Sequence, residues 1–388
     1  MLAIRAARLF DGVGSKLVEP AVVLVGEGRI VSVHHGAVPV PDVEVVELGD
    51  VTLLPGLIDA HVHLVFDASP DPVGRITAAH DDELLAGARA AARIALGAGI
   101  TTVRDLGDRG YVTLRLRDEL ERNPTGGPEV LVAGPPITTI RGHCWYLGGE
   151  ADGVDAIRKA VRERAERGVD VIKIMASGGE LTPGTRSDEA QYTVDELRAA
   201  VEVAHRYGLP VTAHAHAVAG IANAVAAGAD MVEHCSFFTA DGVDVDPAVL
   251  AALAGSRVTV SATLGLLPGP RPATRLAQRL PAIVAALRRV HEAGVPLVCS
   301  SDGGVGEPKP HDVLPYALQH LVEGGFAPVE ALRAATSTAA HACRVGGRKG
   351  HLAPGYDADL LAVRGNPLRD ITALRSVEAV FRTGHRVR

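Results

Sequence analysis

Eight short apolar segments alternate with helix-like segments between residues 52 and 300 of this 388-residue chain. This alternation is what eight parallel strands with connecting helices require, so it predicts an α/β fold, a (β/α)₈ TIM barrel. A doubly wound open sheet is the structural alternative, but no Gly-x-Gly-x-x-Gly turn opens a first helix, which favours the barrel. The predicted strands are residues 52–58, 100–104, 130–133, 170–175, 210–214, 231–234, 257–262 and 296–300.

Two of the intervening helices have recognisable ends. Thr193 and Glu196 form a capping-box pattern at the start of "TVDELRAAVEVAHRYG", and Gly208 ends that segment. The segment "DAIRKAVRERAERG" ends in the same way at Gly168. These ends support separate helices between the predicted strands.

Both ends of the chain have the pattern of short strands and turns. "AVVLVGEGRIVSV" contains two β-branched runs joined at Gly26-Glu27-Gly28, which predicts a hairpin. The tail from residue 350 has no helical period, so we expect it to pair with the N-terminal strands. We therefore expect a small β-sandwich domain formed by residues 1–54 and 350–388, beside a barrel formed by residues 55–349.

Composition excludes several classes of partner. The net charge is −7, without a long run of one sign, so we expect no nucleic-acid surface. No stretch of about 18 apolar residues is present, so we expect no membrane association. The four cysteines lack metal-type or disulfide-type spacing, which is typical of a cytoplasmic protein. The expected partner is a small-molecule substrate, and homo-oligomerisation is left open.

The stretch "LIDAHVHL", residues 57–64, places two histidines in an apolar run. Side chains two apart on a strand point the same way, so His61 and His63 share one face. An unpaired imidazole in a barrel interior is costly, and a ligand or a hydrogen-bond partner is therefore expected. For these two residues alone, a pair of satisfied core histidines is an equal alternative.

Three further polar residues follow apolar strands. His214 ends "LPVTAH", His234 ends "ADMVEH" and Asp302 ends "VPLVCSSD". Each lies at the carboxyl end of a predicted strand, the face on which barrel enzymes build their active sites. Together with His61 and His63 they form a set of nitrogen and oxygen ligands suited to a divalent metal such as zinc.

Lys173 lies between two isoleucines in "VDVIKIMASGG", in a chain with only five lysines. An unpaired ammonium in a barrel interior is strongly disfavoured. Burial lowers the pKa of a lysine, and the neutral amine can react with carbon dioxide to give a carbamate that bridges two cations. A lysine that extends to solvent or pairs with a buried acid is an equal alternative on spacing alone.

The order along successive strands, namely His61 and His63, Lys173, His214, His234 and Asp302, resembles the pattern of the amidohydrolase superfamily. The stretches "LLPGLIDAHVHL", "GITTVRDLG", "HLAPGYDADLLAV" and "VEAVFRTGHRV" also match. Three further stretches resemble one branch of this superfamily, which contains Xaa-Pro dipeptidases, imidazolonepropionase-like proteins and ochratoxin-type amidases. These stretches are "VIKIMASGG", "PVTAHAH" and "VEHCSF".

The resemblance implies a centre with two divalent metal ions, with zinc as the expected metal. His61, His63 and Asp302 would hold the more buried ion, and His214 and His234 the more exposed one. Lys173, as a carboxylated lysine, and a hydroxide would bridge the two ions. Asp302 would also be catalytic, taking a proton from the hydroxide and passing it to the leaving amine.

Four residues are candidates for substrate binding. His143 lies in "TTIRGHCWYLGG", after the third strand, where the resembling dipeptidases have a Gly-His near the substrate, and Arg141 is adjacent. Tyr192 resembles a tyrosine that contacts the substrate carboxylate in those relatives, and His216 shares a strand face with His214. The Cys-Trp-Tyr that follows Gly142-His143 departs from the relatives, so we expect a different pocket.

The resemblance implies hydrolysis of the C–N amide bond of a dipeptide or an N-acyl amino acid. Hydrolysis of a cyclic amide, a lactone or an organophosphate on the same centre is the alternative, since such a hydroxide is not selective. A non-catalytic assembly protein is disfavoured, because it has no need of all six metal-site residues. Arg104 and Asp105, after the second strand, are expected to form a structural ion pair near the site.

Overall fold

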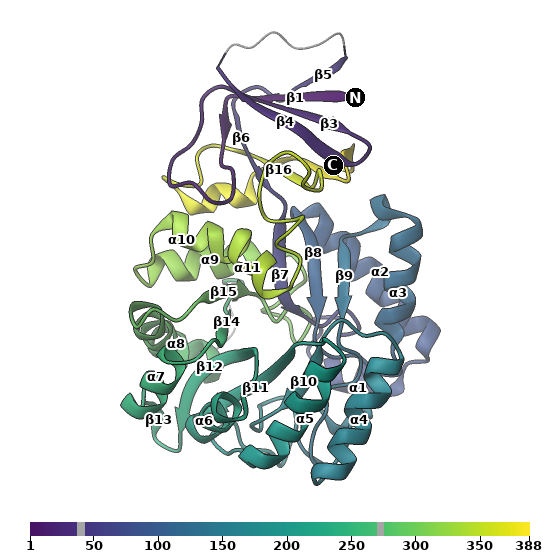
Figure 1. Ribbon diagram of the computed structural model, residues 1–388, viewed down its shortest axis with the longest axis vertical. Helices are drawn as coiled ribbons and strands as arrows, with labels where there is room; N and C mark the ends of the chain where they lie inside the picture. Colours follow the sequence, from purple (N-terminus) through teal and green to yellow (C-terminus); the bar gives the residue numbers. More distant parts are fainter. Residues whose placement is uncertain (37–42, 270–274) are drawn as a thin grey trace.

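The computed structural model describes residues 1–36, 43–269 and 275–388. Within these residues, parallel strands form a barrel of the TIM type with helices around its outside (Figure 1). The barrel strands are β7 (Leu57–Val62), β8 (Ile100–Asp105), β9 (Glu129–Val132), β10 (Ile172–Met175), β11 (Val211–Ala217), β12 (Met231–Thr239), β14 (Thr259–Thr263) and β15 (Leu297–Ser300).

Two hydrogen-bonded seams close the ring of strands. Strands β7 to β9 form one parallel sheet, and β10, β11, β12, β14 and β15 form another. Ile137 joins them on one side, donating its N–H to the carbonyl of Lys173 at 2.8 Å. On the other side Asp302 donates its N–H to the carbonyl of His61 at 2.8 Å, and His63 donates to Gly303 at 2.9 Å. The last strand is thereby tied to the first, so that the two histidines lie beside Asp302.

Helices cover the outside of the barrel, and their ends follow the sequence signals. Thr193 and Glu196 form the predicted capping box at the start of α5, and Gly168 and Gly208 adopt positive φ values after α4 and α5. No helix among the described residues is both long enough and apolar enough to cross a membrane. The helices are α1 (Pro72–Ala78), α2 (Asp81–Gly97), α3 (Val112–Arg122), α4 (Val154–Glu166), α5 (Val194–Arg206), α6 (Val218–Ala227), α7 (Pro247–Ala254), α8 (Arg275–Glu292), α9 (Leu314–Glu323), α10 (Pro328–Ala334) and α11 (Ser337–Ala342).

The two chain ends meet in a pair of sheets at one end of the barrel (Figure 1). The predicted hairpin is confirmed, because β3 and β4 pair antiparallel across a turn with positive φ at Glu27 and Gly28. The tail also pairs with an N-terminal strand, as Leu360 lies opposite Pro55. These sheets contain β1 (Leu2–Ala6), β2 (Arg8–Leu9), β3 (Ala21–Gly26), β4 (Arg29–His35), β5 (Glu44–Glu47), β6 (Val51–Pro55), β16 (Leu360–Arg364), β17 (Val377–Arg382) and β18 (His385–Arg386).

The predicted strand 52–58 is corrected to two strands in different sheets. Residues up to Pro55 form β6 in the terminal sheets, and the chain enters the barrel as β7 at Leu57. Gly56 separates the two strands, and a Cβ atom there would lie 2.1 Å from Oγ1 of Thr101. The glycine thus allows the chain to pass against β8 as it changes sheets.

Candidate metal centre

The expected ligands meet in a cavity of about 290 Å³ at the carboxyl ends of the barrel strands. His61 and His63 come from the end of β7, Lys173 from β10, His214 from β11 and His234 from β12. Asp302, directly after β15, also lines the cavity. The parallel strands therefore bring together all six residues, which are up to 241 positions apart in the chain.

One group of polar atoms surrounds the Oδ1 atom of Asp302. This oxygen lies 3.4 Å from Nε2 of His61 and 3.3 Å from Nε2 of His63, and the two nitrogens are 3.3 Å apart. The Nζ atom of Lys173 is 3.4 Å from the same His61 nitrogen. Nε2 of His61, Nε2 of His63 and Oδ1 of Asp302 therefore lie close enough together to bind one ion.

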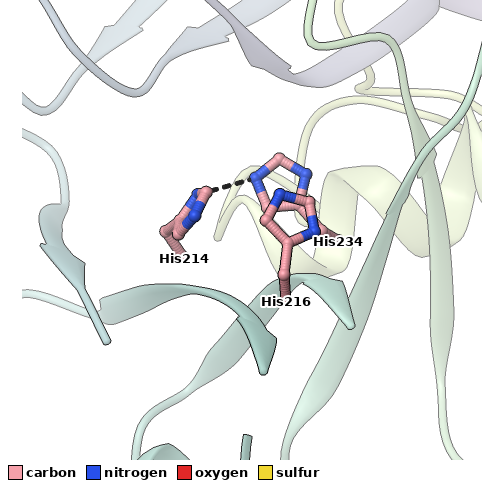
Figure 2. Close-up of side chains that lie close together, drawn as sticks. All are labelled: His214, His216 and His234. Atoms are coloured by element: carbon pink, nitrogen blue, oxygen red, sulfur yellow. Dashed lines mark hydrogen bonds between the residues drawn. The ribbon is translucent and has the colours of Figure 1, made fainter. Parts of the chain in front are cut away.

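A second group lies beside the first. Nε2 of His234 is 2.9 Å from Nδ1 of His214, and Figure 2 shows these two nitrogens pointing toward each other. The rings of His61 and His234 are 5.1 Å apart, which places the two groups side by side. The arrangement provides two adjacent places for a cation.

Each of these four imidazoles has its other nitrogen fixed by a partner. Nδ1 of His61 donates to Glu233 at 2.8 Å, and Nδ1 of His63 donates to the carbonyl of Gly107 at 3.1 Å. Nε2 of His214 donates to the carbonyl of Gly178 at 3.1 Å, and Nδ1 of His234 bonds to the hydroxyl of Thr263 at 2.6 Å. A carbonyl or carboxylate acceptor keeps the proton on the outer nitrogen and leaves the inner nitrogen with a free lone pair.

This donor set fits two divalent metal ions. Imidazole nitrogens and a carboxylate converge in two groups, one of His61, His63 and Asp302 and the other of His214, His216 and His234. In His61, His63, His214 and His234 the outer nitrogen has a partner of the kind that is typical of a metal ligand. Burial lowers the pKa of His61 to about 4 and holds the pKa of His214 and His234 well below the usual value, so these rings are neutral at neutral pH. Neutral rings are the form that binds a metal.

Asp302 and His63 lie side by side in the site, with Oδ1 of Asp302 3.3 Å from Nε2 of His63. Burial works against the carboxylate, but the hydrogen bond from His63 and the nearby positive charges hold the pKa of Asp302 well below its usual range. Burial also opposes a charged His63, but the bond to Asp302 and its charge outweigh this effect and raise the pKa of His63. Asp302 is therefore a carboxylate at neutral pH.

Lys173 is buried and lacks an acidic partner. Among the residues that the structure describes, no carboxylate forms an ion pair with its Nζ, whose nearest polar contact is His61. Burial lowers the pKa of Lys173 to about 8. The nearby carboxylates of Glu233 and Asp302 oppose this lowering, so the alternative of a lysine that pairs electrostatically with a buried acid stays open beside that of a neutral amine.

His216 belongs to the second group, because one nitrogen each from His214, His216 and His234 lie within 4.8 Å of one another. Figure 2 shows the rings of His216 and His234 close together. These two rings stack, with centroids 4.3 Å apart and an interplanar angle of 20°. The His216 ring also stacks on Phe238, at 5.1 Å. Lone pairs lie in the ring plane, so two stacked imidazoles point their lone pairs along parallel directions and not at one ion. Nδ1 of His216 bonds to Ser236 at 2.9 Å. His216 thus supports His234 and forms part of the cavity wall.

The other substrate-binding candidates lie in different places. His143 lines the cavity, its Nδ1 atom is buried without a hydrogen-bond partner, and burial lowers its pKa to about 3. Arg141 is exposed and outside the cavity lining. Tyr192 is also outside it, because its buried hydroxyl donates to the carbonyl of Ala151 at 2.7 Å. The structure therefore brings together His143 and His216 but neither Arg141 nor Tyr192.

The expected ion pair of Arg104 with Asp105 is wrong. Arg104 pairs with Glu233 at 3.0 Å and donates to the carbonyl of Ala60 at 2.7 Å. Asp105 instead accepts backbone N–H groups from Leu64 at 2.7 Å and from Gly107 at 3.1 Å. Neighbours on a strand point to opposite faces, which separates Arg104 from Asp105.

Sequence reasoning missed Glu233, the carboxylate that fixes His61. Strand alternation would place Glu233 and its neighbour His234 on opposite faces. The backbone breaks this rule, because His234, Cys235 and Phe237 have positive φ values of 66°, 49° and 52°. Both side chains therefore contribute to the same site. No feature of the sequence indicates this distortion.

Comparisons with known proteins agree with this geometry. The model of the amidohydrolase family matches residues 52–387. The chain is 31% identical to ochratoxinase from Aspergillus niger over 371 residues, covering 84% of this chain and 73% of that protein. It is 28% identical to imidazolonepropionase from Deinococcus deserti over 377 residues, covering 88% and 85%. The crystal structure of a Xaa-Pro dipeptidase with bound methionine is similar, with a TM-score of 0.89 and 27% identity over 99% of both chains.

Proposed function

Because the chain belongs to the amidohydrolase family and is a hydrolase of carbon–nitrogen bonds, we propose that it hydrolyses the amide bond of a small dipeptide or N-acyl amino acid with two divalent metal ions. One observation carries the proposal. The inner nitrogens of four imidazoles converge with Asp302 and an unpaired Lys173 on one cavity, while each outer nitrogen is fixed.

His61, His63 and Asp302 would hold one ion, and His214 and His234 the other, with zinc as the proposed metal. Bound there, two divalent ions would polarise the scissile carbonyl and lower the pKa of water enough to supply a nucleophile at neutral pH. A carboxylated Lys173 would contribute an anion between the two groups, replacing a buried positive charge with a ligand.

The protein's own groups would manage the protons and the orientation. A carboxylate oxygen of Asp302 would accept the proton of the attacking water and transfer it to the leaving nitrogen. His143 is neutral at neutral pH and has a buried Nδ1 without a partner, so it would hydrogen-bond to the substrate. His216 would form a flat wall beside the reacting group.

The cavity wall favours a substrate with an apolar group. Its apolar lining includes Phe66, Met175, Leu181, Phe238, Leu266 and Ile283. Apolar walls with a few polar groups at the base orient a small substrate by its polar end. Since Arg141 and Tyr192 lie outside the lining, they provide no support for recognition of a free carboxylate. This observation keeps cyclic amides, lactones and organophosphates as the second candidate substrates.

Steady-state rates on a matched panel would test the proposed function. The panel pairs apolar dipeptides and N-acyl amino acids with their C-terminal amides, and adds cyclic amides, lactones and an organophosphate. We expect cleavage of the linear amides. Cleavage of cyclic compounds or esters alone would replace the proposal with the second candidate.

We also propose that the terminal sheets form a separate β-sandwich domain made of residues 1–54 and 350–388. A shared core of Ile4, Val23, Leu53, Leu360 and Phe381 supports this division. Four unpaired, buried cysteines support a cytoplasmic location.

A further inference from the structure

Lys309 is a buried lysine in the loop that follows β15, and its side chain reaches back to the metal centre. Its Nζ donates to the carbonyl of Ser301 at 2.6 Å, and lies 3.4 Å from the carbonyls of Thr263 and Leu264. Only 2% of the residue is exposed. An ammonium group has three N–H donors, so these three carbonyls use all of them.

This pattern differs from that of another buried lysine. Lys349 contacts three carboxylates, those of Glu129, Asp357 and Asp359. Lys309 forms no ion pair among the described residues and contacts main-chain oxygens from two different strand ends. The arrangement suits a residue that fixes backbone at the wall of the cavity, which Lys309 also lines.

The first backbone segment that Lys309 contacts carries Asp302. Asp302 has a φ of 57°, a left-handed conformation that is unfavourable for a residue with a Cβ atom. The preceding residue, Ser301, is held on both sides, because Asp59 accepts its N–H at 3.0 Å and Lys309 donates to its carbonyl. The carbonyl oxygen belongs to the peptide bond that leads into Asp302, so its position helps to set the direction of the Asp302 carboxylate.

The second segment carries the partner of His234. Thr263 contributes its carbonyl to Lys309 and its hydroxyl to Nδ1 of His234, at 2.6 Å. A single ammonium group therefore connects the backbone beneath Asp302, in one ligand group, with the residue that fixes His234 in the other.

We propose that Lys309 is a positioning residue that holds Asp302 and His234 at the distance needed for the two-metal centre. This role rests on the proposed function. The positive charge attracts carbonyl oxygens from β14 and β15 to one point, which keeps the two strand ends together and maintains Asp302 in its left-handed conformation. A neutral side chain of similar length would fill the space without this attraction.

The test compares Lys309→Met with Lys159→Met, which removes an exposed lysine from α4. Displacement of a reacting group by about 1 Å costs about 100-fold, so kcat of Lys309→Met should fall by about that factor with KM changed less than about threefold. Loss of an outer partner weakens metal binding about 10-fold or more, so a chelator should remove the metal at an about 10-fold lower concentration. Elemental analysis after chelator titration measures this without any substrate, and Lys159→Met should match the unchanged protein in both measurements.

Chemical rescue separates the ammonium from the volume it fills. Lys309→Ala lacks three carbon atoms and the ammonium group, which propylammonium can supply. Added propylammonium should therefore restore metal retention and kcat, while neutral 1-propanol should not. If Lys309→Met does not fold, Lys309→Ala is refolded with propylammonium or with 1-propanol, and the metal retention of the two preparations is compared. Wild-type metal retention in Lys309→Met, or equal rescue by 1-propanol, would overturn the proposal. Absence of amide cleavage by the unchanged protein would reject the proposed function instead, and metal retention would still decide the role of Lys309.

Discussion

Replacing Glu233 with glutamine should weaken metal binding through His61, without changing any metal ligand. Glu233 is fully buried and accepts hydrogen bonds from His61, Arg104 and Thr212. The bonds from Arg104 and Thr212 go to Oε1, and the bond from His61 goes to Oε2. A glutamine has one oxygen and one NH₂ group in these two positions, so it cannot satisfy all three donors.

Either orientation of the amide has a cost. If the oxygen faces Arg104, the NH₂ group faces Nδ1 of His61, and the ring proton must move to Nε2, the atom that points at the centre. If the amide is reversed, Arg104 remains buried without its carboxylate, although it keeps its 2.7 Å bond to the carbonyl of Ala60. Changes of this kind lower metal affinity by about 10- to 100-fold, and breaking a buried ion pair costs about 3–5 kcal/mol of stability.

The assay is chelator competition with elemental analysis, together with denaturant unfolding of the metal-free protein. Glu119→Gln is the matched control, because Glu119 forms a two-bond ion pair with Arg89 at the surface. Its loss should cost less than about 1 kcal/mol and leave metal binding unchanged. If Glu233→Gln keeps its metal at the wild-type chelator concentration and unfolds like the control, the assigned role of Glu233 is refuted.

Three further changes test other parts of the account. Asp302→Asn should keep the fold and lower kcat by about two to four orders of magnitude, measured on the best amide substrate; an unchanged rate would assign the proton transfer to another group. Lys173→Ala should lose most activity and retain less than two ions per chain by elemental analysis, and wild-type values would exclude a carboxylated lysine. At Glu129 burial opposes ionisation, but Arg348, Lys349 and Arg382 outweigh it and lower the pKa from 4.5 to about 2. The contribution of Glu129 to stability is therefore complete above pH 4.5 and is lost as the pH falls toward 2. Glu129→Gln should remove up to about 3 kcal/mol of this pH-dependent stability, measured by denaturant unfolding at several pH values. The same pH profile of stability in the variant and the unchanged protein would contradict this role of Glu129.

The barrel could be predicted from the sequence because its strands are separate apolar runs with clear helix ends between them. The run "VTLLPGLIDA" is continuous, however, and periodicity cannot show that β6 and β7 belong to different sheets. The change of sheet depends on the close contact of Gly56 with Thr101, which forms only in the folded chain.

The ligand candidates could be predicted because His61, His214, His234 and Asp302 all follow the same rule, a polar residue at a strand end. The residues that hold these ligand candidates in place could not be predicted. Glu233 reaches His61 through an irregular backbone, and Lys309 acts through main-chain carbonyls that no residue pattern identifies. Tyr192 lies in the expected segment, but its hydroxyl is bound to Ala151 outside the cavity.

Metal stoichiometry is the most direct test of the proposed two-metal centre. Protein purified after growth in excess zinc or manganese should contain two divalent ions per chain by elemental analysis, and should regain both ions and its amide hydrolase activity together when the metal-free form is reloaded. A maximum of one bound ion per chain under these conditions would contradict the account.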